Sequence, residues 1–271
     1  MRRCTGRRRS ARSERLVPEV ESIYPLLTAQ AIAILLVFAR IGTALMFLPG
    51  FGESFVPARF RLLFGLALAV ILHLAVPVGE AVTRGLSGLL VPLAFEVTIG
   101  LWIGVTSRIL MTALQFAGYQ VGMVSGLSNA FAPDSAAFQG GTILSSALIL
   151  SGVAALFATD LHHLIIDALL MSYEVFPVGE LITGDLADQI VRAAGASVYL
   201  GVALASPFFI LTLLLNLAMG LANRMMPTMA VFFVAGPILI GFVLLVMAIA
   251  VPAMLRGFLN HLADWLGSFT F

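Results

Sequence analysis

The residues best suited to chemistry are a run of acids and imidazoles, Asp160, His162, His163 and Asp167, in a strongly apolar part of the chain. Asp160, His163 and Asp167 would share one helix face, because residues three and four positions apart are neighbours on a helix surface. Such a row is typical of a proton or ion path. Adjacent histidines on a helix point about 100° apart, which is poor geometry for chelation, so no metal site is expected.

Three further charged residues lie deep in apolar stretches, namely Arg40, Glu96 and Arg108. They allow a second interpretation, in which buried charges pair between helices. A charge at bilayer depth costs roughly 2.5–3.5 kcal/mol on insertion scales, so each group should face protein or water. Since no other stretch supplies a matching series of polar groups, pairing between helices or a position near the headgroups is favoured over an ion path.

The sequence carries no recognisable catalytic motif. It has no G-x-S-x-G, H-E-x-x-H, Walker or Rossmann glycine pattern. Ser125, Ser128 and Ser135 have no histidine base near them in sequence, and the single cysteine, Cys4, excludes an internal disulfide framework. We therefore expect no enzyme activity, no cofactor and no metal.

The composition describes a protein whose main solvent is not water. Of its 271 residues, 60% are hydrophobic and 11% charged, and the mean hydropathy is +1.05. A soluble domain usually has about 25% charged residues. The class that fits is a polytopic membrane protein.

Long apolar stretches are separated by breaks rich in Gly, Pro and charge. There are six of them, at about 26–48, 62–76, 89–117, 143–171, 193–221 and 229–255. A membrane-crossing helix needs about 20 residues, so the second stretch is marginal. The stretches at 89–117 and 143–171 exceed one span, which predicts tilting, kinking or a projecting end. The predicted fold is all-α, with about six long apolar helical segments, some kinked or hairpin-forming.

Three regions are distinguished by composition. Residues 1–22 form an Arg-rich tail, residues 23–258 the helical membrane domain, and residues 259–271 a short amphipathic end. The tail fits a cytosolic anchor near anionic lipid, or a true translation start that lies further along. A nucleic-acid arm does not fit beside so many spans, so no nucleic-acid partner is expected.

The segment GLSNAFAPDSAAFQGG, residues 126–141, is soft and polar in an otherwise apolar chain. Irregular backbone at membrane depth survives only when it is buried in protein or lines a wet cavity. Small residues give the segment freedom to move, and Phe131 and Phe138 supply apolar bulk that could close a narrow path. The segment is either a plug of this kind or an ordinary surface loop.

Small residues at a spacing of four indicate close packing of helices. Gly100-x3-Gly104 and Gly122-x3-Gly126 both allow two backbones to approach closely. Each match is weak alone, because the chain has 25 glycines.

Two asparagines mark the end of the fifth apolar stretch. Asn216 and Asn223 are two helical turns apart and would share one face, where they could hydrogen-bond a partner helix. Arg224 and Pro227 then mark a polar helix end. Structural pairing is the favoured role for these side chains.

Four blocks of the sequence together resemble the FliR family, the membrane subunits of the flagellar type III export gate and its virulence-secretion counterparts. They span residues 49–67, 96–104, 122–134 and 214–238. The last block, with its Asn-Leu-Ala-x-Gly-Leu-x-Asn-Arg-x-x-Pro run, is the most specific. For the first, second and fourth blocks, the resemblance implies residues that pack helices or subunits together. These are Glu53, Pro57, Arg59, Glu96, Gly100, Gly104, Asn216, Asn223, Arg224 and Pro227.

The third block departs from some family members, because this chain has Pro133-Asp134-Ser135 where they have Asp-Pro. By resemblance, the loop near 123–139 is the plug that closes the export path. The residues assigned to this gate are Met123, Gly126, Leu127, Ser128, Asn129, Phe131, Asp134 and Phe138.

The resemblance implies a subunit of a multi-chain spiral export gate in the bacterial inner membrane, at the flagellar basal body. Implied partners are FliP-type and FliQ-type gate subunits, an FlhB-type subunit, unfolded flagellar export substrates and membrane lipid. The expected function is structural and gating. The alternatives are a virulence secretion gate of the same superfamily, or a six-span small-solute or ion transporter, for which internal repeats would be expected but none is convincing.

Overall fold

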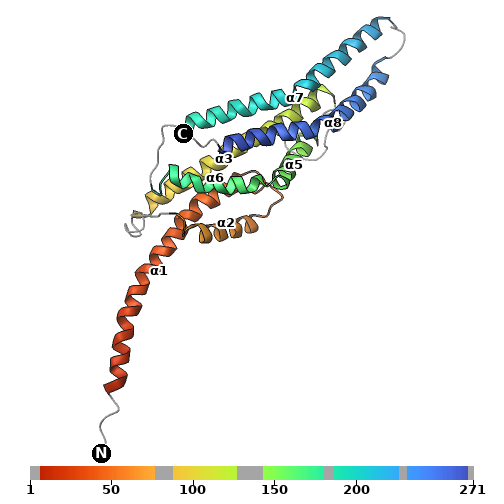
Figure 1. Cartoon of the computed structure of the whole chain (residues 1–271). Helices are drawn as coiled ribbons and strands as arrows, with labels where there is room; N and C mark the ends of the chain where they lie inside the picture. The colour runs from red at the N-terminus through yellow and green to blue at the C-terminus, as the bar shows by residue number, and fades with distance from the viewer. Residues whose placement is uncertain (1–6, 77–87, 127–142, 180–185, 226–230, 268–271) are drawn as a thin grey trace, which may run out of the picture.

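The computed structural model describes residues 7–76, 88–126, 143–179, 186–225 and 231–267. All regular structure in these ranges is helical, which confirms the all-α prediction (Figure 1). The helices are α1 Arg7–Phe47, α2 Ala58–Leu72, α3 Leu90–Val124, α5 Ile143–Ala158, α6 Leu161–Val175, α7 Leu186–Met225 and α8 Val231–Gly267.

Helix α3 forms the centre of the molecule and packs against α7, α1 and α5. It buries residues on several sides, including Ile99, Trp102, Leu110 and Leu114. A helix that is apolar all round belongs in an interior, because no face suits water. The indole Nε1–H of Trp102 also donates to the carbonyl of Leu186 at 3.0 Å, which fixes the start of α7 beside α3.

Among the side chains described, those in the C-terminal part of helix α1 belong to the core. Buried residues begin at Ala33 among the side chains described, and the N-terminal half extends away from the other helices (Figure 1). The helix is continuous from Arg7, so the backbone shows no break at the expected tail boundary near residue 22.

The apolar stretch at 143–171 is a bent pair of helices rather than one span. Helices α5 and α6 meet at an angle of 79°. Asp160 sits between them in the left-handed region with φ 58°, a conformation in which Asp is enriched among non-glycine residues. This confirms the expected kink and corrects the single helix face assumed for Asp160, His163 and Asp167, because Asp160 precedes the first residue of α6.

Four helical segments are long and apolar enough to cross a membrane: Leu27–Phe47, Leu90–Val124, Leu186–Met225 and Gly236–Gly267. The bent pair would make a fifth. Helix α2, with 15 residues, is only about 22 Å long and is short for a crossing. The described part of the chain is therefore a polytopic membrane protein.

Helices α7 and α8 pack side by side, and the end of α7 projects with the start of α8 beyond the other helices as a long hairpin (Figure 1). Within the chain itself, only 22% of the most apolar window of α7 and 17% of that of α8 is buried. Helix α7 continues through Pro207, and α8 through Pro237 and Pro252. Large apolar surface of this extent marks contact with protein or membrane.

The C-terminal end of α8 returns to the body. Phe258, Leu259 and Leu262 are buried, and the helix continues to Gly267. The apolar face predicted for this segment therefore packs against the chain's own core.

Candidate functional site

Two opposite charges are fully buried at the crossing of α1 and α3. Arg40 and Glu96 have no exposed side-chain surface. The Nε–H of Arg40 donates to Oε2 of Glu96 at 2.7 Å, and its Nη2 donates to Oε1 at 3.0 Å. This two-point contact is the geometry in which guanidinium and carboxylate bind most strongly.

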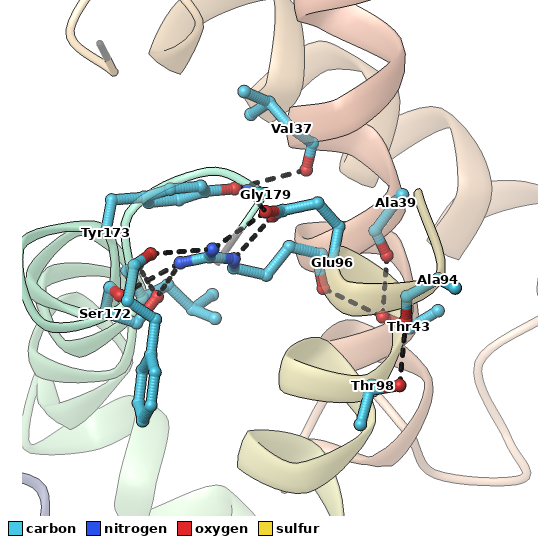
Figure 2. A network of polar contacts seen from close by, with 12 residues as sticks. Val37, Ala39, Thr43, Ala94, Glu96, Thr98, Ser172, Tyr173 and Gly179 are labelled. Atoms are coloured by element: carbon cyan, nitrogen blue, oxygen red, sulfur yellow. Dashed lines mark hydrogen bonds and ion pairs between the residues drawn. The ribbon is translucent and has the colours of Figure 1, made fainter. Parts of the chain in front are cut away.

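The end of helix α6 and the residue after it supply the remaining contacts of Arg40, as Figure 2 shows for the labelled Ser172 and Tyr173. Nη1 donates to the carbonyl and Oγ of Ser172 at 2.9 and 3.3 Å, and Nη2 donates to the carbonyl of Phe176 at 2.9 Å. The guanidinium lies 3.9 Å from the ring centre of Tyr173, whose hydroxyl donates to the Val37 carbonyl at 3.4 Å. All five N–H donors of Arg40 therefore have acceptors.

A glycine turn completes the shell around Glu96. The backbone N–H of Gly179 donates to Oε1 of Glu96 at 3.3 Å (Figure 2). Gly179 has φ +85°, which glycine adopts without the steric cost of a Cβ. The network joins α1, α3, α6 and the turn after α6, segments far apart in the sequence.

Two glycines let α1 and α3 meet at this network. A Cβ on Gly100 would overlap the hydroxyl of Thr43 and the carbonyl of Arg40. A Cβ on Gly104 would lie 2.8 Å from the carbonyl of Ala44. The backbones are thus in direct contact, the arrangement that small residues four apart permit.

A second ion pair fixes the segment between α1 and α2. Nη1 of Arg108, on α3, donates to Oε1 of Glu53 at 2.5 Å, with the arginine side chain 41% exposed and the carboxylate 8%. Nη2 of Arg61 donates to the carbonyls of Glu53 and Val56 at 2.9 and 3.2 Å. Glu53 therefore links this segment to the central helix.

The other family positions in this segment lie at the start of α2. Pro57 precedes the helix, and its carbonyl accepts from the amides of Phe60 and Arg61 at 3.1 and 3.3 Å. Arg59 is exposed in the first turn.

The predicted gate residues are only partly described. Met123 is 53% exposed near the end of α3, and Gly126 follows in a left-handed conformation with φ +73°. The gate residues that lie outside the described ranges are Leu127, Ser128, Asn129, Phe131, Asp134 and Phe138.

The asparagines lie on the projecting part of α7, away from the ion pairs. Asn216, Asn223 and Arg224 are all exposed in the chain alone. Pro227 lies outside the described ranges. The structure therefore does not bring them together with Glu53 or Glu96.

Sequence reasoning identified Arg40 and Glu96 as buried charges but missed what holds them. Ser172, Tyr173 and Gly179 fall at the end of an apolar stretch and in the acidic break after it. A backbone carbonyl as acceptor leaves no side-chain signal, so only the polar Ser-Tyr pair at the stretch end could have indicated this shell.

Sequence reasoning also missed a cleft between α3 and α7. It has a volume of about 420 Å³ and is lined by Thr112, Gln115, Phe116, Tyr119, Ser197 and Val198. The hydroxyls of Thr112 and Ser197 lie 3.1 Å apart across it.

Membrane-length helices tied by a buried charge network define the chain as an all-helical membrane protein. The family model described as "Bacterial export proteins, family 1" matches residues 31–265. The chain is 39% identical to flagellar biosynthetic protein FliR of Caulobacter vibrioides, over 81% of this chain and 89% of that protein. It is 28% identical to the protein of that name from Escherichia coli, over 84% and 86%.

A third relative extends the similarity further along the chain. Flagellar biosynthetic protein FliR of Aquifex aeolicus is 26% identical over 89% of this chain and 93% of its own length. The chain belongs to the FliR-type bacterial export proteins, and the resemblance seen in the sequence is confirmed.

Proposed function

We propose that the chain is a structural and gating subunit of the flagellar type III protein-export channel. In this proposal it lies in the bacterial inner membrane at the flagellar basal body and builds the export path with FliP-type and FliQ-type subunits, near an FlhB-type subunit. Residues 23–258 are proposed as its helical membrane and export-gate domain. The observation that carries the proposal is the similarity to proteins named FliR over about nine-tenths of their length.

The exposed hairpin of α7 and α8 supports assembly with other chains. Leu213, Met225 and Ile249 are 69, 81 and 74% exposed. Apolar side chains at this density require cover, because each buried apolar side chain gains about 1.5–3 kcal/mol over an exposed one. Sister subunits and lipid are the cover that an export gate provides, and the exposed amides of Asn216 and Asn223 supply hydrogen-bonding groups for a partner helix.

The loop near 123–139 is proposed as the element that closes the path. Support comes from its composition and from its attachment: Met123 is exposed where α3 ends, and no described atom lies within 4 Å of a Cβ placed on Gly126. Unfolded export substrates would displace the loop.

Conductance tests this closure directly. The assembled complex is reconstituted in lipid bilayers with residues 128–139 shortened, and we expect small-ion leakage well above that of the wild-type complex. Shortening the segment 77–87 by the same approach is the control and should leave the bilayer sealed. An unchanged conductance in the 128–139 variant, with the complex intact, would refute the plug.

A virulence secretion gate is the second candidate within the same superfamily. The relatives from Caulobacter vibrioides, Escherichia coli and Aquifex aeolicus all carry the flagellar name, which favours the flagellar system. A six-span solute transporter has less support, since the described chain carries a bent helix pair and a 15-residue α2 in place of two of six plain spans.

A further inference from the structure

The bend between α5 and α6 gathers three side chains with metal-binding atoms. A carboxylate oxygen of Asp160 and a ring nitrogen each of His162 and His163 all lie within 4.8 Å of one another. The two imidazole ring centres are 4.1 Å apart. The 100° separation of adjacent side chains on a helix, which argued against chelation, is thus overcome by the way the rings turn.

The Asp160 carboxylate does not cap helix α6, although its position before the helix predicts that it would. An Asp that precedes a helix usually accepts a hydrogen bond from the amides of the first turn. Asp160 precedes α6 but makes no side-chain cap; its backbone carbonyl accepts from the His163 amide at 3.0 Å instead. The carboxylate is left beside the imidazoles.

His162 adds an independent observation. Its Nδ1 is buried and has no hydrogen-bond partner among the residues described. A buried polar nitrogen without a partner is costly, so such a group in a native protein needs an explanation, and beside a second imidazole and a carboxylate a bound ion supplies one. Neutral imidazole nitrogen is the most common protein ligand of transition metals.

We propose that Asp160, His162 and His163 bind one divalent transition-metal ion of the zinc class. Two imidazoles and one carboxylate suit such an ion, and water would complete a four-coordinate shell. Bonds of about 2.0–2.2 Å require ligand atoms about 3.4 Å apart. His163 and Asp160 are exposed, so rotation of these side chains can supply the contraction.

Bound metal would hold the 79° bend between α5 and α6. It would also restrict the motion of the segment before α2, through a row of aromatic contacts. His162 lies 5.4 Å from the ring of Phe157, at the end of α5, and Phe157 lies 5.7 Å from Phe51. Phe51 stacks on Phe64 of α2 at 5.3 Å. Fixing the His162 ring therefore fixes one end of an aromatic row that reaches α2.

Zinc titration of the full-length chain tests this site. The chain is purified in detergent with an affinity tag that contains no histidine. Calorimetry should give one ion per chain and a rise in Tm, since a ligand bound only to the native state stabilises it. Asp160→Asn keeps a residue that tolerates left-handed backbone and should weaken binding at least tenfold. His162→Gln with His163→Gln should abolish binding.

His73→Gln is the matched control, because His73 is a separate imidazole whose Nδ1 lies 2.6 Å from the Val70 carbonyl. It should bind zinc as the wild type does. The proposal fails if wild-type chain binds no zinc, or if the variants at 160, 162 and 163 bind as tightly as the control. Zinc binding is measured without export, so a failure of the metal-site proposal is distinguishable from a failure of the proposed function.

Discussion

At the scale of residues, the Arg40–Glu96 pair is the most demanding feature of the chain. Taking two charges out of water is expensive, and good geometry with every donor satisfied only offsets that cost. Removing one partner leaves the other charge buried and uncompensated, which is why the pair acts as a lock on the packing of α1, α3 and α6.

Glu96→Gln should lower the free energy of unfolding by about 3–5 kcal/mol, the usual cost of breaking a buried pair. The amide loses the charge that balances Arg40 while keeping the shape of the side chain. Thermal unfolding in detergent, followed by circular dichroism, measures the change.

Arg192→Met is the control for this prediction. Arg192 pairs with Asp188 at 2.7 Å, but their side chains are 78 and 52% exposed. Exposed pairs of this kind contribute about 0.5 kcal/mol or less. Equal losses of stability in Glu96→Gln and Arg192→Met would contradict the proposed lock.

The pair on Glu53 lies nearer the surface and should matter less. Glu53→Gln removes the charge opposite Arg108, whose side chain is 41% exposed and can take up water. We expect a loss of about 1 kcal/mol, well below that for Glu96→Gln. A loss as large as that of Glu96→Gln in the same unfolding experiment would overturn this ranking.

At the scale of elements, the contact of α1 with α3 depends on the absence of side chains. Gly100 meets the backbone of α1 at Arg40, so any Cβ must push the helices apart and lengthen the hydrogen bonds of the buried pair. The close packing at Gly100 and the geometry of the buried ion pair therefore depend on each other.

Gly100→Ala should destabilise the fold by about 1–3 kcal/mol, the usual effect of overpacking. Gly195→Ala, in α7, is the matched control, because nothing lies within 4 Å of the added carbon and alanine favours the helix. Thermal unfolding of both variants decides the point. A Gly100→Ala variant as stable as its control would show that the helices are not in contact.

Hydropathy predicts the positions of most helices, but it does not predict the bend at Asp160 or the groups that bind Arg40. Apolar runs located α1, α3, α7 and α8, since their length and composition alone satisfy a bilayer. The break at Asp160 was not located, because no Gly or Pro marks it. The ligands of Arg40 were not found either, since two of them are carbonyls of Ser172 and Phe176.

At the scale of the whole molecule, the chain leaves most of the apolar surface of α7 and α8 unburied, to be covered by protein or by lipid. The body around α3 is closed by two ion pairs, whereas the projecting hairpin shows apolar residues and two asparagines to its surroundings. This division fits a subunit with a fixed body and a hairpin that inserts among partners.

Replacing Asn216 and Asn223 together by Leu should weaken co-purification with the partner subunits, because leucine cannot make the hydrogen bonds that we propose these amides form with a partner helix. Gln189→Leu, at the start of α7 and away from the projecting part, is the control. Full recovery of the complex by the double variant would count against an interface at these positions.

Removal of residues 1–20 should preserve motility. The family match begins at residue 31, and the described buried core begins at Ala33. Swimming in soft agar measures the effect. Loss of motility with normal levels of the shortened protein would show that the tail takes part in export.

The most direct measurement of the central claim is the composition of the complex that the chain forms in its own cells. Mass spectrometry after purification in mild detergent should find FliP-type and FliQ-type subunits in constant ratio to this chain. Recovery of the chain alone, as a monomer that moves a small solute across liposomes, would contradict the account.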